Sequence, residues 1–325
     1  MSQIHCRLAL LMGCLISLTN AASANDSTGY VATGGVTYLK NPHISMASED
    51  LYISQERIRV RYEFVNDAPQ SVTETVLFPM PVIDYAETRD GDFADTAGLV
   101  ESFKVLVNGQ SIKPTLHTRG FWKEKDITAA LTDCGFTDRE IVFPYFNDEP
   151  DEQWRNRVDT CFEKMLKQGI ISETKDDEAQ RIWASQIIYS WPQKFPSKKT
   201  LLVEHEYRPL VGGSVAGIAR GNSEYARDLQ RAYCFDKTFW QKMTQGSKTY
   251  PAYTALGYVL TTGANWAKPI GRFKLTIDKP KDTLMSLCWD SSLKKVSETR
   301  FEATKTNFKP TRDIDIIFAV AADPQ

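Results

Sequence analysis

The stretch RIRVRYEF, residues 57–64, alternates between apolar and charged side chains. In an extended chain Ile58, Val60, Tyr62 and Phe64 point to one face, and the charged residues point to the other. Alternation with a period of two is typical of a strand with one buried face. The chain must therefore build a sheet whose apolar face is covered by a second layer.

The neighbouring segments extend this pattern. SVTETVLF, residues 71–78, predicts a second strand, which the prolines of FPMP end because proline cannot continue a ladder. Asn108-Gly109, between FKVLV and QSIKP, is typical of a type I′ hairpin turn. Residues 25–120 are therefore predicted to form an antiparallel β-sandwich-like domain.

Residues 121–195 change to a helical period and are predicted to be a helical insertion. Asp126 can cap a short helix that Gly135 closes. A second helix in DEQWRNRVDTCFEKML carries one apolar stripe, and a third is predicted from about Asp177. The apolar stripes of these last two helices comprise Trp154, Val158, Cys161 and Met165, and then Trp183, Ile187 and Trp191.

Residues 196–325 return to strands and are predicted to be a C-terminal β-rich domain with a helical interruption around residues 222–245. The extended segments are TLLVEHEY, ALGYVLTT, GRFKLTID, TLMSLCW, RFEATKT and DIDIIFAV. The fold class predicted for the whole chain is mainly β. Its architecture is an antiparallel β-sandwich, either one or two sandwiches, with the helical insertion in the middle of the chain.

The first 24 residues are typical of a cleavable signal peptide. Arg7 is followed by the apolar run LALLMGCLISL and then by Ala22-Ser23-Ala24, an A-x-A cleavage site. The expected mature chain begins at Asn25, in the periplasm or the medium. The alternative is a lipoprotein attached through Cys14, because Leu11 to Cys14 loosely resembles a lipobox.

Charge and cysteine content agree with export. Removal of residues 1–24 leaves 38 basic and 41 acidic residues, which gives no electrostatic argument for binding nucleic acid or an anionic membrane. The four cysteines left are typical of two disulfides in an exported chain. We expect Cys134–Cys161, because both lie on apolar stripes of neighbouring helices, and Cys234–Cys288; the pairings that cross between these two regions stay open.

Several motifs together resemble an uncharacterised bacterial exported family, the domain of unknown function 4424. They are GGV, EDLYIS, RVRYEFVN, VLFPMP, YSWPQKFP, EHEYRPLVGGS and YVLTTGANWAKPIGRF, in this order along the chain. The resemblance implies an exported β-rich protein and supplies no catalytic residues. Residues 57–81 also resemble the start of vault/inter-α-trypsin domains, which is an analogy of fold and not of chemistry.

The clearest candidate for catalysis is VEHEY, residues 203–207, where His205 stands between two glutamates. In a strand His205 shares a face with Val203 and Tyr207, and neither glutamate can reach its ring. A half-buried structural histidine, hydrogen-bonded to its surroundings, is therefore favoured. The glycine-rich loop from Gly212 to Gly221 narrowly misses the G-x-S-x-G pattern and lacks the G-K-[ST] ending of a phosphate loop.

Two features are candidates for binding. Arg57, Arg59 and Arg61 place charges roughly 7 Å apart along one sheet face, which is typical of a solvated face and is also a grip for anionic glycan groups. Trp266, in a loop, could plug the sandwich or stack on a sugar. No metal site and no cofactor are predicted. The favoured function is non-enzymatic binding of an envelope glycan or protein, and the alternative is a hydrolase of envelope material that uses dispersed carboxylates.

Overall fold

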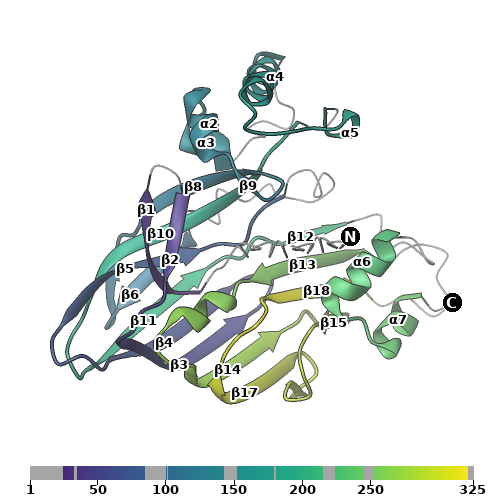
Figure 1. Cartoon of the computed structure of the whole chain (residues 1–325). Coiled ribbons are helices and arrows are strands. Elements are labelled where there is room, and N and C mark those ends of the chain that lie inside the picture. The colour runs from purple at the N-terminus through teal and green to yellow at the C-terminus, as the bar shows by residue number, and fades with distance from the viewer. Residues whose placement is uncertain are drawn as a thin grey trace, which may run out of the picture.

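The structure is a computed structural model, and it describes residues 25–32, 35–84, 100, 102–142, 152–178, 181–214, 224–244 and 252–320. Strands dominate and form three sheets, while helices gather in two places (Figure 1). The predicted signal peptide, residues 1–24, and most of the glycine-rich loop, residues 215–221, lie outside the described residues.

The largest sheet has eight strands, and all its neighbours are antiparallel except β14 and β3, which are parallel. Its early and late strands come from opposite ends of the chain, so segments 25–120 and 196–325 share one sheet. The order across the sheet is β16 (Lys294–Lys295), β17 (Arg300–Phe308), β14 (Ile270–Asp278), β3 (Ile44–Ile53), β4 (Ile58–Asn66), β11 (Thr200–Tyr207), β6 (Lys104–Val107) and β7 (Gln110–Ile112).

Two smaller antiparallel sheets cover the buried face of the large one (Figure 1). The six-stranded sheet has the order β2 (Gly35–Leu39), β1 (Ser27–Ala32), β5 (Val72–Pro79), β10 (Ala184–Phe195), β8 (Thr115–Trp122) and β9 (Lys125–Asp126). The four-stranded sheet has the order β12 (Gly212–Ser214), β13 (Tyr253–Tyr258), β18 (Ile314–Val320) and β15 (Thr283–Leu287). Side chains of all three sheets form one hydrophobic core, so the architecture is a mainly antiparallel β-sandwich, as predicted.

The alternation in β4 positions this core. Ile58, Val60, Tyr62 and Phe64 are all at most 1% exposed, while the arginines between them face solvent. The hairpin between β6 and β7 turns at Asn108-Gly109, where φ is +50° and +79°, as a type I′ turn requires.

The helical insertion packs at one end of the six-stranded sheet (Figure 1). It contains α2 (Thr128–Asp133), α3 (Asp138–Val142), α4 (Glu152–Lys167) and α5 (Lys175–Glu178). Val158, Cys161 and Met165 of α4 are buried together with α2 and Trp183, which confirms the predicted stripe. The disulfide Cys134–Cys161 joins the end of α2 to α4, with the Cα atoms 5.7 Å apart, as expected.

The predicted third helix is wrong. Residues 184–195 form β10, paired with β5 on one side and β8 on the other. Trp183, Ile187 and Trp191 recur every four residues. This spacing places side chains on one face of a helix, which has about 3.6 residues per turn, and equally on one face of a strand, which repeats every two residues. Ile188 is also buried on the opposite face of β10, which removes the alternation that would have distinguished a strand.

The helical interruption predicted near residues 222–245 is present as α6 (Glu224–Tyr233) and α7 (Lys237–Thr244). Both helices pack on the outer side of the four-stranded sheet, α6 through Leu229 and Tyr233 and α7 through Phe239 and Met243. The second expected disulfide, Cys234–Cys288, ties this pair of helices to the chain just after β15. A short 3₁₀ turn, η1 (Thr261–Asn265), follows β13.

Candidate functional site

His205 points into the sandwich from β11. The strand alternates between inward residues such as Val203 and Tyr207 and outward Glu204 and Glu206, so neither glutamate lies beside the imidazole. His205 is 1% exposed. The prediction that VEHEY is a strand is confirmed, and its histidine, which was expected to be half-buried, is fully buried.

The partner of His205 is Asp26, 179 residues earlier in the chain. Nε2 of His205 lies 3.0 Å from Oδ1 of Asp26, and both side chains are fully buried. The other carboxylate oxygen of Asp26 and Nδ1 of His205 make no hydrogen bond to the described residues.

Aromatic rings enclose the His205 imidazole. The ring centroids of Phe78, Trp191, Tyr62 and Phe103 lie 4.8, 5.3, 5.5 and 5.6 Å away. Phe78 and Trp191 belong to the six-stranded sheet, Tyr62 belongs to the eight-stranded sheet, and Phe103 directly precedes β6. The imidazole is therefore both a packing element and a hydrogen-bonding group.

A second carboxylate, Glu49 of β3, lies in the same buried region and is 0% exposed. It accepts a hydrogen bond from Nδ2 of Asn25 at 3.1 Å and a longer one from the Tyr258 hydroxyl at 3.4 Å. The Tyr258 hydroxyl in turn lies 3.0 Å from that of Tyr62. We call Asn25, Asp26, Glu49, Tyr62, His205 and Tyr258 the buried polar cluster.

Burial dominates the electrostatics of this cluster. Desolvation raises the pKa of Asp26, while the charge of His205 and its hydrogen bond lower that pKa in part. Desolvation also raises the pKa of Glu49 to about 8, helped by the nearby Asp26 and opposed by the hydrogen bonds from Asn25 and Tyr258. A carboxyl group with this pKa is largely protonated at neutral pH. The cluster combines acid and base groups, yet each of them is closed to solvent.

The first candidate binding residue, Trp266, lies beneath the surface. It is 1% exposed, packs on Phe64 with ring centroids 4.6 Å apart, and donates from Nε1 to the backbone oxygen of Asp26 at 2.8 Å. Trp266 therefore fills the end of the sandwich and is not exposed for stacking on a sugar.

Arg57, Arg59 and Arg61 lie on the exposed face of the eight-stranded sheet. Their register places Arg59 opposite Glu206 and Arg61 opposite Glu204, and the guanidinium groups of Arg57 and Arg59 lie 5.6 and 5.8 Å from the Tyr52 ring. Facing acids and an aromatic neighbour make this a mixed, solvated surface. Its use as a grip for anionic groups stays a prediction.

The three histidines of the mature chain do not meet. His117 Nε2 lies 2.7 Å from Ser190 Oγ on the six-stranded sheet, His43 is exposed before β3, and His205 is in the core. Within the described residues no group of three or more His, Cys, Asp or Glu side chains is placed to hold a metal ion.

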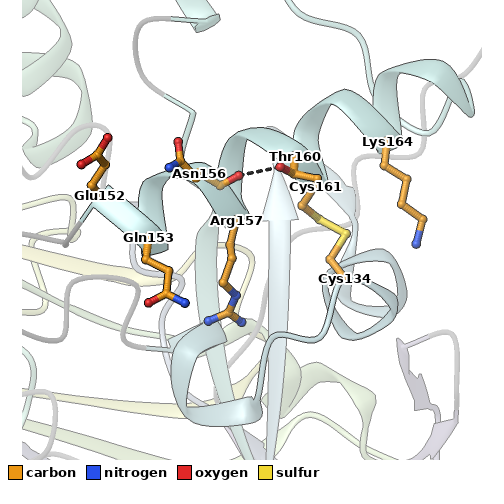
Figure 2. Close-up of a pocket in the computed structure, with 8 residues that line it drawn as sticks. All are labelled: Cys134, Glu152, Gln153, Asn156, Arg157, Thr160, Cys161 and Lys164. Atoms are coloured by element: carbon orange, nitrogen blue, oxygen red, sulfur yellow. Dashed lines mark hydrogen bonds between the residues drawn. A yellow bond between two sulfur atoms is a disulfide. The ribbon is translucent and has the colours of Figure 1, made fainter.

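A hollow on the helical insertion is open to solvent. It has a volume of about 540 Å³, and its lining comes from α4 and the end of α2. Figure 2 shows Gln153, Arg157 and Lys164 extending from one side of α4, the side on which the disulfide reaches Cys134. Their spacing of four and seven residues keeps them on one helical face. The remaining lining residues are Glu152, Asn156, Thr160 and Cys161.

Arg157 is fixed at the edge of this hollow. Its Nη1 donates to Glu140 Oε1 at 2.7 Å, its Nη2 donates to the Gly135 oxygen at 3.2 Å, and its guanidinium lies 4.7 Å from the Phe136 ring. Lys164 donates to the backbone oxygen of Asp133 at 3.3 Å. The disulfide and these contacts hold α4 against α2 and α3, so the hollow is built on a rigid frame.

A protein-family model described as "Domain of unknown function (DUF4424)" matches residues 24–317. The chain belongs to this family. No curated protein matches the sequence.

A search of solved structures finds a protein of Legionella pneumophila described as a "putative nutrient binding protein". It is 15% identical in sequence, with a TM-score of 0.45, and the match covers 91% of this chain and 70% of that one. Similarity at this level carries no functional argument for the DUF4424 chain.

The sequence did not reveal Asp26, Glu49 and Tyr258 as partners of His205. Glu49 and Tyr258 lie within segments that resemble the family, but these segments are far apart along the chain and no spacing rule connects them with His205. The sequence marks only Asn25 and Asp26, and only indirectly, because they directly follow the predicted A-x-A cleavage site. Among the described residues, no helix has the length and hydrophobicity needed to cross a membrane.

Proposed function

We propose that this DUF4424 protein is an exported, non-enzymatic binding protein that recognises a polar component of the cell envelope through the hollow on α4. The hollow carries the proposal. Its volume of about 540 Å³ falls within the roughly 300–1,000 Å³ typical of small-molecule sites. The two disulfides support an oxidising compartment outside the cytoplasm.

The lining of the hollow indicates the ligand chemistry. Gln153 and Asn156 supply amide donors and acceptors, Thr160 a hydroxyl, and Lys164 a positive charge that no described carboxylate neutralises. Arg157 is already paired with Glu140, so its charge is partly satisfied. This mixture suits a glycan fragment with hydroxyl, acetamido and carboxylate groups better than an apolar ligand.

The alternative, a hydrolase that uses a pair of carboxylates, has less support. Asp26 and Glu49 lie close enough to influence each other, and both are 0% exposed in the buried polar cluster. A glycosidase needs two carboxyl groups that flank a bound sugar. A substrate cannot reach these two without opening the sandwich.

The test is a thermal-shift screen of the mature protein against peptidoglycan fragments, lipopolysaccharide core oligosaccharides, divalent metals and envelope lipids. A ligand at about one hundred times its Kd should raise the melting temperature by roughly 5 °C. Lys164→Gln and Asn156→Ala should reduce the shift given by the active glycan fraction. The matched control is Lys167→Gln, which removes the same charge from the same helix at a side chain that is 79% exposed and outside the lining.

Three outcomes decide the matter. No shift with any glycan refutes glycan binding, and an equal shift in wild type and Lys164→Gln refutes the hollow as its site. Release of reducing sugar ends by the mature protein would favour the hydrolase.

A further inference from the structure

The start of the mature chain is buried. Asn25, Asp26 and Ser27 are 0% exposed and Thr28 is 3% exposed. Chain termini are normally exposed and poorly ordered unless specific contacts tie them down. The residues that directly follow the expected cleavage site are instead part of the core.

Asn25 is held at its backbone and its side chain. Its backbone N donates to Thr262 Oγ1 at 2.6 Å, and the same hydroxyl donates to the Asn25 oxygen at 2.6 Å. Nδ2 of Asn25 donates to Glu49. A Cβ at Gly263 would lie 2.7 Å from Asn25 Nδ2, so the absence of a side chain at Gly263 allows this close approach.

The buried polar cluster has fewer hydrogen-bond donors than its oxygen atoms can accept from, and more carboxyl groups than basic groups. Within the described residues it contains two carboxyl groups, Asp26 and Glu49, and one basic group, His205. Asn25 Oδ1 and Asp26 Oδ2 accept no hydrogen bond there. A peptide nitrogen at Asn25 has a single hydrogen, which Thr262 takes. A carboxylate without a counter-charge is costly in such surroundings.

We propose that cleavage between Ala24 and Asn25 completes this cluster, because the α-ammonium group released at Asn25 becomes the buried counter-charge of Glu49. Hydrolysis of the bond by a leader peptidase consumes one water and leaves a carboxylate on Ala24 and an ammonium on Asn25. The ammonium has three hydrogens. One continues to serve Thr262 Oγ1, and two are free for the oxygen atoms of the cluster. The cluster then holds two acids and two bases.

The proposal predicts a distinctive dependence on pH. With a peptide bond at Asn25, the pKa of Glu49 rises from 4.5 to about 8. This folded-state pKa lies above the unfolded one. The contribution of Glu49 to stability is therefore fully present below pH 4.5 and is lost as the pH rises to about 8. With the ammonium present Glu49 is ionised and paired, so this loss disappears. The ammonium contributes only while it is protonated, and α-amino groups ordinarily lose their proton at roughly 7.7–8.0, so its contribution is lost at higher pH.

The experiment compares two forms of the same chain, released from a fusion by a protease that leaves no extra residue. One begins at Asn25 and the other at Ala24, so they differ in whether Asn25 carries an ammonium or an amide. At pH 7.5 we expect the Asn25 form to melt roughly 5 °C higher. The difference should widen from pH 5 to pH 8 and close at higher pH. Both forms are also made with Glu49→Gln, which separates the loss of charge from the bulk of the added residue.

In the Glu49→Gln background we expect the difference between the two forms to fall by at least half. Equal melting temperatures from pH 5 to pH 9, or an undiminished difference with Glu49→Gln, would overturn the proposal. A second measurement does not depend on stability. Reductive methylation of the native Asn25 form at pH 7.5 should label lysines and spare the α-amine, whereas the Ala24 form should be labelled at its terminus. Rapid labelling of Asn25, or exported protein that begins at another residue, would equally overturn it.

Discussion

Replacement of His205 tests whether the buried polar cluster stabilises the sandwich. His205→Leu keeps an apolar side chain among the aromatic rings but removes the donor 3.0 Å from Asp26 Oδ1. Asp26 then loses its partner while both of its oxygens stay buried. Removing one partner of a buried pair in this way costs roughly 3–5 kcal/mol.

His205→Gln is the milder change. Glutamine can place an N–H group near the position of the imidazole Nε2, so the hydrogen bond to Asp26 partly survives while the ring contacts with Phe78 and Trp191 are lost. We expect a loss of about 1–3 kcal/mol, typical of a perturbed buried hydrogen bond. The predicted order of stability is wild type, then His205→Gln, then His205→Leu.

The assay is urea unfolding of the mature protein at pH 7, followed by tryptophan fluorescence, with the m-value checked for each variant. Asp26→Asn completes a double-mutant cycle with His205→Leu, and we expect a coupling energy of about 1–3 kcal/mol. A His205→Leu variant within 0.5 kcal/mol of wild type, or additive effects in the cycle, would refute the reasoning. Glycan binding in the hollow should survive in every variant that folds.

Three further changes test other parts of the structure. The double variant Cys134→Ala/Cys161→Ala opens a loop of 27 residues and should lose about 3.5 kcal/mol by the chain-entropy estimate, measured by thermal unfolding with the reduced wild type as control. Gly271→Ala places a Cβ 2.5 Å from the backbone oxygen of Ala47 on β3, so we expect a loss of at least about 2 kcal/mol in urea; an unchanged midpoint would contradict the register of β14 on β3. Trp266→Phe leaves a buried backbone carbonyl without its indole donor and should cost about 1–3 kcal/mol, whereas a sugar-stacking role predicts lost binding at unchanged stability.

Local sequence patterns correctly predicted the helices and strands that have one buried face and one exposed face. In β4 the buried and exposed residues alternate, and in α4 the buried residues follow the helical period, so both were found from the sequence. β10 is buried on both faces over most of its length, and its regular tryptophan and isoleucine spacing fits a helix equally well. Strand and helix could be separated there only by knowing the neighbours β5 and β8.

The candidate site was harder to predict for a related reason. The orientation of His205 follows from the alternation of its own strand, so its burial could be inferred. Its partner Asp26 is 179 residues away, and Glu49 stands beside Asp50 in EDLYIS with no pattern that distinguishes it. Pairs of this kind are set by sheet order, and that order depends on contacts spread over the whole chain. The hollow on α4 likewise depends on how α2 and α4 pack, although the cysteines that join them were recognisable.

The parallel pairing of β3 with β14 sets the order in which the protein can be completed. Six residue pairs, from Arg272 opposite Ser48 to Ile277 opposite Ile53, join segments more than 220 positions apart. During synthesis from the amino terminus, β3 has one edge without its partner until residue 278 has been made. Loops of this length close slowly, and exposed strand edges in the meantime favour aggregation. The first half of the chain therefore stays without its final fold until nearly all of the protein is available.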